Sequence, residues 1–386
     1  MWAARDFSYR KLRRKAERDG ITTALTAAME LSTRSVIAPP ICHRLFDRGW
    51  FRTVSQEVLL ESAVDVAWLE GASEDSNQTP FAVNIGSGYV LPTTGLVLTS
   101  EGDPIAESVG PAGDKQNGII KSLVRHGFVD GLGLTTSILT RNIESLSTSA
   151  KTLETVCPLS YRYINYYHWT IETLPRIRYA RAYEEQTGDE VTYLIWSDAP
   201  PYVTETLDML GVAEQKVERA TNTVYQASNV VVPSFPEQTR ADYRWFRDTI
   251  LENVGPEADL ITPKNNVYIS RSNAIERQVV NESEVVETLS AYGFESYELE
   301  NQSVAQNVLL FHEADVVVGA HGAGLTDLIY CDDTTIIELF GSKVKDPYER
   351  LAETMGVEYR SLVCEPVSTD IRIDVDELTE LVKNHS

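Results

Sequence analysis

The sequence predicts an α/β protein in which the C-terminal part forms a doubly wound parallel sheet. After residue 266, short apolar strands alternate with helical stretches. Strands are expected at 267–270, 296–299, 316–319 and 335–340, and helices at 281–293 and 304–314, with a short helix that ends at residue 330. Alternation of this kind places parallel strands between two layers of helices. Ligands of such sheets bind beyond the carboxyl ends of the strands.

The length of the chain predicts more than one domain. A chain of 386 residues exceeds what one hydrophobic core usually serves, and 42% of its residues are hydrophobic. We expect a linker at 253–266, where glycine and proline interrupt the periodic pattern. The expected parts are a basic N-terminal arm over 1–55, an N-terminal domain over 56–255 and a C-terminal domain over 256–386.

The pattern is weaker in the N-terminal domain. Over residues 56–150 short apolar runs alternate with turn residues, so this stretch is expected to be rich in strands. The strands expected here lie at 58–60, 64–68, 89–92 and 95–99, and two more at 191–196 and 230–233. A helix is expected at 203–210, because Gly211 provides a typical helix end.

The net charge of −23 argues against nucleic acid as a partner, because proteins that bind nucleic acid need a basic surface. The 57 acidic residues are accompanied by 24 Arg and only 10 Lys. This composition resembles that of proteins from salt-accumulating halophiles, chiefly haloarchaea, in which high salt screens the repulsion between surface charges. An ordinary acidic protein is the alternative.

Residues 1–55 depart from this acidity, with 11 Lys and Arg against 5 Asp and Glu. The basic run 10–15 precedes a segment, 21–37, whose apolar residues recur at helical spacing. The pattern fits an amphipathic contact of residues 1–40 with an anionic membrane surface. It also fits a helical arm that packs on the acidic body, or a tail. No apolar run is long enough to cross a membrane, and the four separated cysteines are typical of reduced cytoplasmic thiols.

The first candidate for chemistry is the segment 165–176, N-Y-Y-H-W-T-I-E-T-L-P-R. Asn165 is expected to cap a helix that places His168 and Glu172, four residues apart, on one face. Such a titratable pair is typical of a general base and the group that orients it, although a surface pair without function is the alternative. Pro175 is expected to kink or end the helix. The positions expected to support the site or to lie on its acceptor side are Asn165, Tyr167 and Arg176.

The second and third candidates follow strands of the predicted parallel sheet. Arg271 comes directly after the strand at 267–270, where a guanidinium can bind a phosphate through two parallel hydrogen bonds. The segment G-A-H-G-A-G-L, residues 319–325, follows the next buried strand, and its glycines let the backbone approach a ligand. The donor-binding residues predicted here are Arg271, His321, Gly322, Ala323, Gly324 and Glu338, the last as an acceptor for a ribose hydroxyl.

Several reaction classes lack their motifs. No Asp-x-Asp follows any of the strands predicted above, so the sequence predicts no metal site and no cofactor. The sequence has neither GxSxG nor HExxH, and it lacks the GxGxxG that a nicotinamide-dependent epimerase would need.

Three segments, N-Y-Y-H-W-x-x-E-x-L-P-R, V-Y-I-S-R and V-V-V-G-A-H-G-A-G-L-T-D-L-I-Y, occur in this order, and together they resemble glycosyltransferase family 61. The family includes plant xylosyl- and arabinosyltransferases, animal O-linked N-acetylglucosaminyltransferases and many prokaryotic capsule-type enzymes. The resemblance extends over roughly residues 60–365. With its acidity, the chain looks like a prokaryotic, haloarchaeal member.

The resemblance implies a GT-B architecture, with two Rossmann-like domains facing a cleft and the donor nucleotide on the C-terminal one. It implies metal-independent, inverting transfer from a nucleotide sugar to a glycan or lipid-linked glycan acceptor, in the synthesis of surface polysaccharides or glycoconjugates. By this resemblance, Glu172 or His168 is the base, and Arg271 and the turn 321–324 hold the diphosphate. Many relatives have Asp where this chain has Glu172, so the base stays open between the two residues.

A different class of function shares part of this pattern. A non-catalytic nucleotide-sugar-binding or scaffold subunit of a glycan assembly complex would need Arg271 and His321 but no base. Binding of a donor without turnover distinguishes it from an enzyme. In either case the expected location is the cytoplasm, with a peripheral contact at the inner face of the membrane if the basic arm binds lipid.

Overall fold

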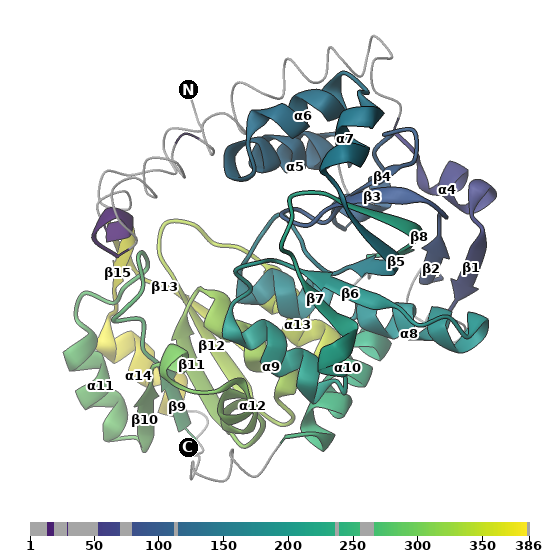
Figure 1. The fold of residues 1–386 in the computed structure, drawn as a ribbon. Coiled ribbons are helices and arrows are strands. Elements are labelled where there is room, and N and C mark those ends of the chain that lie inside the picture. The colour runs from purple at the N-terminus through teal and green to yellow at the C-terminus, as the bar shows by residue number, and fades with distance from the viewer. Residues whose placement is uncertain are drawn as a thin grey trace. The chain divides into compact units, whose positions relative to one another are not determined.

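The computed structural model describes residues 14–18, 29, 53–69, 79–111, 115–235, 239–254 and 266–383. The described residues form two compact units (Figure 1). The first unit holds 29, 53–208 and 212–242, and the second holds 14–18, 209–211 and 243–383. Most of the predicted arm 1–55 and of the predicted linker 253–266 lies outside the described residues, so the predicted domain boundaries stay predictions.

The first unit is built on a mixed sheet of eight strands. Their bounds are β1 (Asp65–Trp68), β2 (Phe81–Asn84), β3 (Gly88–Leu91), β4 (Leu96–Thr99), β5 (Lys151–Pro158), β6 (Thr192–Ile195), β7 (Val217–Arg219) and β8 (Tyr225–Pro233). The order is β1-β2-β8-β5-β6-β7, and β3 pairs with β8 and β4. The four strands β5 to β8 are parallel, whereas β1 to β4 pair antiparallel. Because β8 returns to the far side of β5, the connections reverse between these two strands.

Helices occupy much of a stretch that the sequence predicts as strands. The bounds are α4 (Gln56–Ser62), η3 (Ala106–Val109), α5 (Lys115–Val129), α6 (Leu132–Leu139) and α7 (Ile143–Ser149). The strand prediction at 58–60 is wrong, because the Ser55 hydroxyl accepts a hydrogen bond from the amide of Val58 and caps α4. In α5, Ile119, Ile120 and Leu123 recur at helical spacing and pack against β3 and β4.

The remaining elements of the first unit follow its parallel strands. After β5 come a π-helical turn, η4 (His168–Thr173), and α8 (Arg176–Thr187). After β6 come α9 (Pro201–Met209) and η5 (Glu214–Lys216). The helix α10 (Arg240–Glu252) follows β8, and from residue 243 onward it belongs to the second unit. The helix predicted at 203–210 is confirmed, and the strand predicted at 191–196 is β6.

The second unit contains the predicted parallel sheet. Its strands are β9 (Asn266–Ile269), β10 (Phe294–Tyr297), β11 (Val316–Ala320), β12 (Thr335–Phe340) and β13 (Glu358–Val363). All four pairings are parallel, in the order β10-β9-β11-β12-β13. In chain order this is 2-1-3-4-5, so the connections reverse between β9 and β11. Ligands of open α/β sheets bind at such a reversal, beyond the carboxyl ends of the strands.

The helices of this unit form two groups. The first group, α11 (Glu282–Ser290) and α14 (Val375–Lys383), packs on one face of the sheet in a common core with alternate residues of β11. The second group is α12 (Val304–His312), η8 (Ala323–Tyr330) and α13 (Pro347–Met355), in which α12 and α13 both contact η8. A 3₁₀ turn, η7 (Leu299–Asn301), and a hairpin, β14 (Glu365–Val367) and β15 (Asp370–Arg372), complete the unit.

One described part of the basic arm contacts the acidic body. The guanidinium of Arg14 donates hydrogen bonds to both carboxylate oxygens of Asp370, at 3.0 and 2.8 Å, and to the carbonyl of Ile275 at 2.7 Å. Asp370 is buried. The position of Arg14 therefore agrees with the alternative in which the basic arm packs on the acidic body. No helix among the residues that the structure describes is long and apolar enough to cross a membrane.

Candidate functional site

The first group of candidate side chains lies on the turn η4, beyond the carboxyl end of β5. The backbone amide of His168 donates to the side-chain oxygen of Asn165 at 3.0 Å, which is the capping contact predicted for Asn165. Nδ1 of His168 lies 2.7 Å from Oε2 of Glu172. The structure therefore brings the two predicted residues into direct contact. A π-helical turn is rare and is frequently found at functional sites.

Aromatic rings enclose the histidine. The ring of Tyr163 stacks on that of His168 with centroids 4.7 Å apart, and Tyr161 and Tyr167 present their edges at 5.8 and 5.4 Å. The side chain of His168 is 25% exposed and that of Glu172 12%. Tyr161 and Tyr163 were not among the predicted site residues. Their signal in the sequence is their place directly after β5, at the ligand side of the sheet.

The contact between His168 and Glu172 determines what each can do. An ionised carboxylate only accepts hydrogen bonds, so Nδ1 of the neutral imidazole carries the proton in this pair. Nε2 then holds a lone pair and is able to accept a proton. The arrangement is that of a base oriented by a carboxylate.

Arg176 lies in the core of the first unit. The residue is 1% exposed, and its guanidinium donates to the carbonyl of Pro233 at 3.2 Å and to that of Pro158 at 3.5 Å. These carbonyls end β8 and β5, the two strands between which the connections reverse. The guanidinium also lies 4.2 Å from the centroid of the Phe235 ring. Burial lowers the pKa of Arg176.

The second group lies where the connections of the second sheet reverse. Arg271 follows β9, and Gly322 follows β11, its neighbour in the sheet. A Cβ atom at position 322 would overlap the guanidinium of Arg271. The side chain donates through Nη2 to the carbonyl of Glu276 at 3.2 Å, while its buried Nε has no partner among the described residues. Burial lowers the pKa of Arg271 to about 10, so the group is cationic at neutral pH.

His321 is held from the interior of the second unit. Its Nδ1 lies 2.5 Å from Oε1 of Glu338, which is fully buried in β12, and its ring stacks on Phe340 with centroids 5.4 Å apart. The second carboxylate oxygen of Glu338 accepts a hydrogen bond of 2.6 Å from the hydroxyl of Tyr359. Each oxygen of Glu338 thus has one protein partner, and its contact with a ribose stays a prediction. Sequence reasoning missed Tyr359.

The glycine-containing turn leads into η8, which starts at Ala323 and is a 3₁₀ helix. A Cβ atom at Gly324 would lie 2.9 Å from the Leu299 side chain, so the glycine permits close packing there. Within the described residues, no three His, Cys, Asp or Glu side chains are grouped as a metal site would require. Cys157, Cys331 and Cys364 are free and buried.

The turn η4 and the β9–β11 reversal are both within one stretch that matches a known family. The family model of Glycosyltransferase 61 matches residues 166–337. This stretch contains His168, Glu172, Arg271 and His321, and it ends one residue before Glu338.

Two curated relatives show the same similarity over shorter stretches. The EGF domain-specific O-linked N-acetylglucosamine transferase of Drosophila melanogaster is 33% identical over 98 residues, which are 24% of this chain and 19% of the relative. The beta-1,2-xylosyltransferase of Arabidopsis thaliana is 31% identical over 88 residues, 22% of this chain and 16% of the relative. The matches thus span less than a fifth of the length of these relatives. Together with the Glycosyltransferase 61 match, they indicate a glycosyltransferase domain.

Proposed function

We propose that this protein is an inverting glycosyltransferase that moves a sugar from a nucleotide-sugar donor to a hydroxyl of a glycan or lipid-linked glycan. The contact between His168 and Glu172 carries the proposal, because it supplies a base within the stretch that matches Glycosyltransferase 61. The proposal includes a GT-B arrangement, in which two Rossmann-like units face a cleft and the second holds the donor.

In the proposed reaction His168 is the general base. Its Nε2 takes the proton of the acceptor hydroxyl while that oxygen attacks C1 of the donor sugar from the face opposite the diphosphate. The bond between C1 and the phosphate oxygen breaks, and its electron pair leaves with the nucleoside diphosphate. Glu172, 2.7 Å from Nδ1, stabilises the imidazolium that forms.

The diphosphate gains negative charge as it leaves, so it needs fixed donors. Arg271 has Nη1 and Nε available beside the backbone of Gly322, and a planar guanidinium suits phosphate oxygens. His321 stands at the same turn, with Nδ1 held by Glu338 and Nε2 left for the donor. These positive and polar groups lead us to propose a reaction without a metal ion or cofactor.

The biological setting is also a proposal. The composition favours a prokaryotic, haloarchaeal enzyme of surface polysaccharide or capsule-type synthesis that works in the cytoplasm. The basic residues of 1–55 favour a peripheral contact with an anionic membrane, although Arg14 itself binds Asp370. Sedimentation with anionic vesicles, with and without residues 1–40, tests this contact.

Transfer from a panel of UDP, GDP, CMP and dTDP sugars to simple glycoside acceptors tests the activity. The variants are His168→Asn, Glu172→Gln and Arg271→Ala. His312→Asn is a matched control, because His312 is also partly exposed and paired with a carboxylate, 3.6 Å from Asp332. We expect the three site variants to lose transfer and the control to keep it. Donor binding without transfer by the wild type would favour the non-catalytic binding subunit instead.

A further inference from the structure

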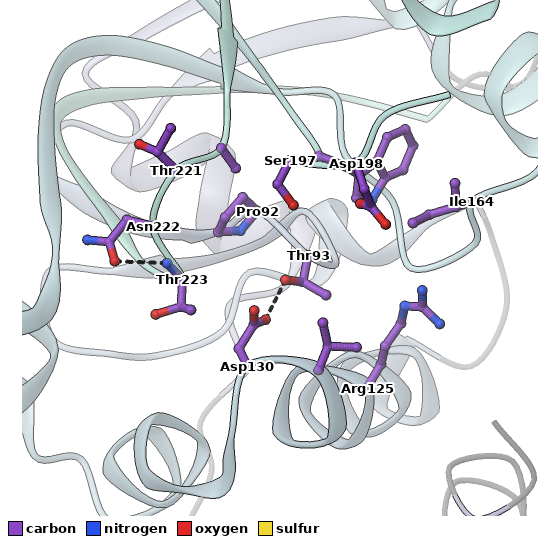
Figure 2. A pocket seen from close by; sticks show the side chains of 13 residues that line it. Pro92, Thr93, Arg125, Asp130, Ile164, Ser197, Asp198, Thr221, Asn222 and Thr223 are labelled. Carbon is purple, nitrogen blue, oxygen red and sulfur yellow. Dashed lines mark hydrogen bonds between the residues drawn. The ribbon is translucent and has the colours of Figure 1, made fainter. Parts of the chain in front are cut away.

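The first unit contains a cavity of about 620 Å³ that the predicted site does not use. Its walls come from the turn between β3 and β4, the end of α5, and the residues that follow β6 and β7 (Figure 2). The carboxyl ends of parallel strands are where α/β sheets bind ligands. The volume lies within the range of about 300–1,000 Å³ that is typical of small-molecule sites.

The wall carries hydroxyl and carboxylate groups that have no partner among the residues that the structure describes. Ser197 and Asp198 follow β6 and are exposed, and Thr223 precedes β8. Among the described residues, none of these three side chains forms a hydrogen bond or ion pair. Ser and Thr hydroxyls both donate and accept, whereas a carboxylate accepts from several donors. The wall therefore offers free hydrogen-bonding capacity to a ligand.

A second carboxylate forms the floor. Oδ2 of Asp130 accepts a hydrogen bond from the hydroxyl of Thr93 (Figure 2). It accepts a second one from Nδ1 of the buried His126 at 2.7 Å. Among the described residues, none donates a hydrogen bond to its other oxygen, Oδ1. These contacts fix Asp130 in place, so it would present an oriented acceptor to a ligand.

The charge of the lining argues against a nucleotide. Asp130 and Asp198 contribute two carboxylates and Arg125 one guanidinium, so a diphosphate would meet more negative than positive charge. The ligand that matches this wall is uncharged and rich in hydroxyl donors. Ile164 and Val129, the latter 57% exposed, add apolar surface on which the C–H face of a sugar ring can pack.

The cavity is connected to the proposed base. The indole of Trp196, in the cavity wall, donates to the carbonyl of Tyr161 at 3.1 Å, and the ring of Tyr161 contacts the ring of His168. Ile164 precedes His168 by four residues, so their Cα atoms are at most about 14 Å apart. The chain segment that joins the cavity wall to the proposed base is therefore short.

We propose that this cavity binds a neutral segment of the acceptor glycan and holds it beside His168. The proposal rests on the proposed glycosyl transfer, and it adds the class of the acceptor and the residues that select it. Asp198 would accept hydrogen bonds from sugar hydroxyls, and Thr223 would both donate to them and accept from them. The carboxylates of Asp130 and Asp198 would repel an acidic glycan.

Binding of defined trisaccharides to the full chain tests the proposal without turnover. The probes are neutral trisaccharides of xylose, glucose, mannose, galactose and N-acetylglucosamine, and trigalacturonic acid as the acidic comparison. The variants are Asp198→Ala and Thr223→Val, and Asp208→Ala on the exposed side of α9 is the matched control. Titration calorimetry gives the affinity for each trisaccharide and for a nucleotide sugar.

We expect at least one neutral trisaccharide to bind to the wild type. Asp198→Ala and Thr223→Val should weaken this binding tenfold or more, whereas Asp208→Ala should leave it unchanged. None of the three substitutions should change the affinity for the nucleotide sugar. The proposal is overturned if no neutral trisaccharide binds, if both cavity variants bind it as the wild type does, or if they weaken the nucleotide sugar instead. Trisaccharide binding that depends on Asp198, in a protein that transfers no sugar, would support the cavity and contradict the proposed transfer.

Discussion

The guanidinium of Arg271 lies directly against the backbone of Gly322, with no room for a Cβ atom between them. The two residues follow β9 and β11, which are neighbours in the sheet. In the chain, α11, β10, η7 and α12 lie between these two strands. The backbone at Gly322 is extended, with a φ of 173° that any residue adopts. The glycine is therefore required for the close approach and not for its backbone conformation.

We expect Gly322→Ala to weaken donor binding without unfolding the protein. The added methyl group would push the guanidinium away from the turn, and a hydrogen bond to a charged group contributes about 1.5–3 kcal/mol. This corresponds to a loss of about 10- to 100-fold in donor affinity, measured by titration with the nucleotide sugar that the wild type binds. Gly133→Ala is the control, because a Cβ atom at Gly133 meets nothing within 4 Å. Equal losses in the two variants would contradict the prediction.

We expect Arg271→Met to weaken donor binding without lowering the stability of the protein. Burial lowers the pKa of Arg271 to about 10, below the ordinary value for arginine, which means that the folded state holds this charge less readily than the unfolded state does. Removing the charge removes that penalty. We expect a Tm equal to or above that of the wild type, together with a loss of at least about 10-fold in donor affinity. A marked fall in Tm would show that the guanidinium is a structural group.

Kinetics distinguish the roles of His168 and Glu172. If His168 is the base, His168→Ala lowers kcat by about 10²- to 10⁴-fold, the usual contribution of general base catalysis. Glu172→Ala then lowers kcat less, because the imidazole remains and only its orientation and the stabilisation of the imidazolium are lost. The donor Kd stays unchanged in both variants. A larger loss for Glu172→Ala than for His168→Ala would assign the base to the carboxylate.

Arg176 is expected to act on stability and not on catalysis. Arg176→Ala leaves the carbonyls of Pro158 and Pro233 without their donor and removes the contact with Phe235. We expect the free energy of unfolding to fall by about 2–4 kcal/mol, as measured by urea denaturation. Arg176→Lys should restore little of it, because an ammonium group lacks the fork that reaches both carbonyls. An unchanged midpoint with a raised acceptor KM would instead place Arg176 in the acceptor site.

Tyr359→Phe tests the hydrogen bonds behind His321. The hydroxyl of Tyr359 donates to the fully buried carboxylate of Glu338, and burial raises the pKa of this tyrosine well above its ordinary value. Without the hydroxyl, one oxygen of Glu338 has no donor, which costs about 1–3 kcal/mol of stability. We expect a lower denaturation midpoint and a weaker donor affinity. Tyr292→Phe is a control, since Tyr292 lies in the turn after α11 and is only partly buried.

Much of the second unit could be predicted from the sequence. The strand predicted at 335–340 matches β12, and that at 316–319 falls within β11, because both are continuous apolar runs with turn residues at their ends. The first unit was harder to predict. The apolar triplet at 58–60 is short enough to suit a strand or a helix, and the cap at Ser55 together with packing decided for the helix.

In the candidate site, too, one contact could be predicted from the sequence and others could not. The pairing of His168 with Glu172 follows from a spacing of four residues, so the sequence predicts it without knowledge of the fold. The burial of Arg176 and the hydroxyl of Tyr359 behind Glu338 are contacts between elements that lie apart in the chain. No local pattern encodes them.

By itself, the sequence determined the alternation of strands and helices in the second unit, and with it the position of Arg271 and His321 at the carboxyl ends of their strands. Local periodicity suffices for this, because it fixes the direction of each strand relative to the helix that follows. The tertiary structure decided that β9 lies between β10 and β11, which brings Arg271 to Gly322. Strand order depends on which strand edges pair after long crossovers, and that choice is made by packing over the whole unit.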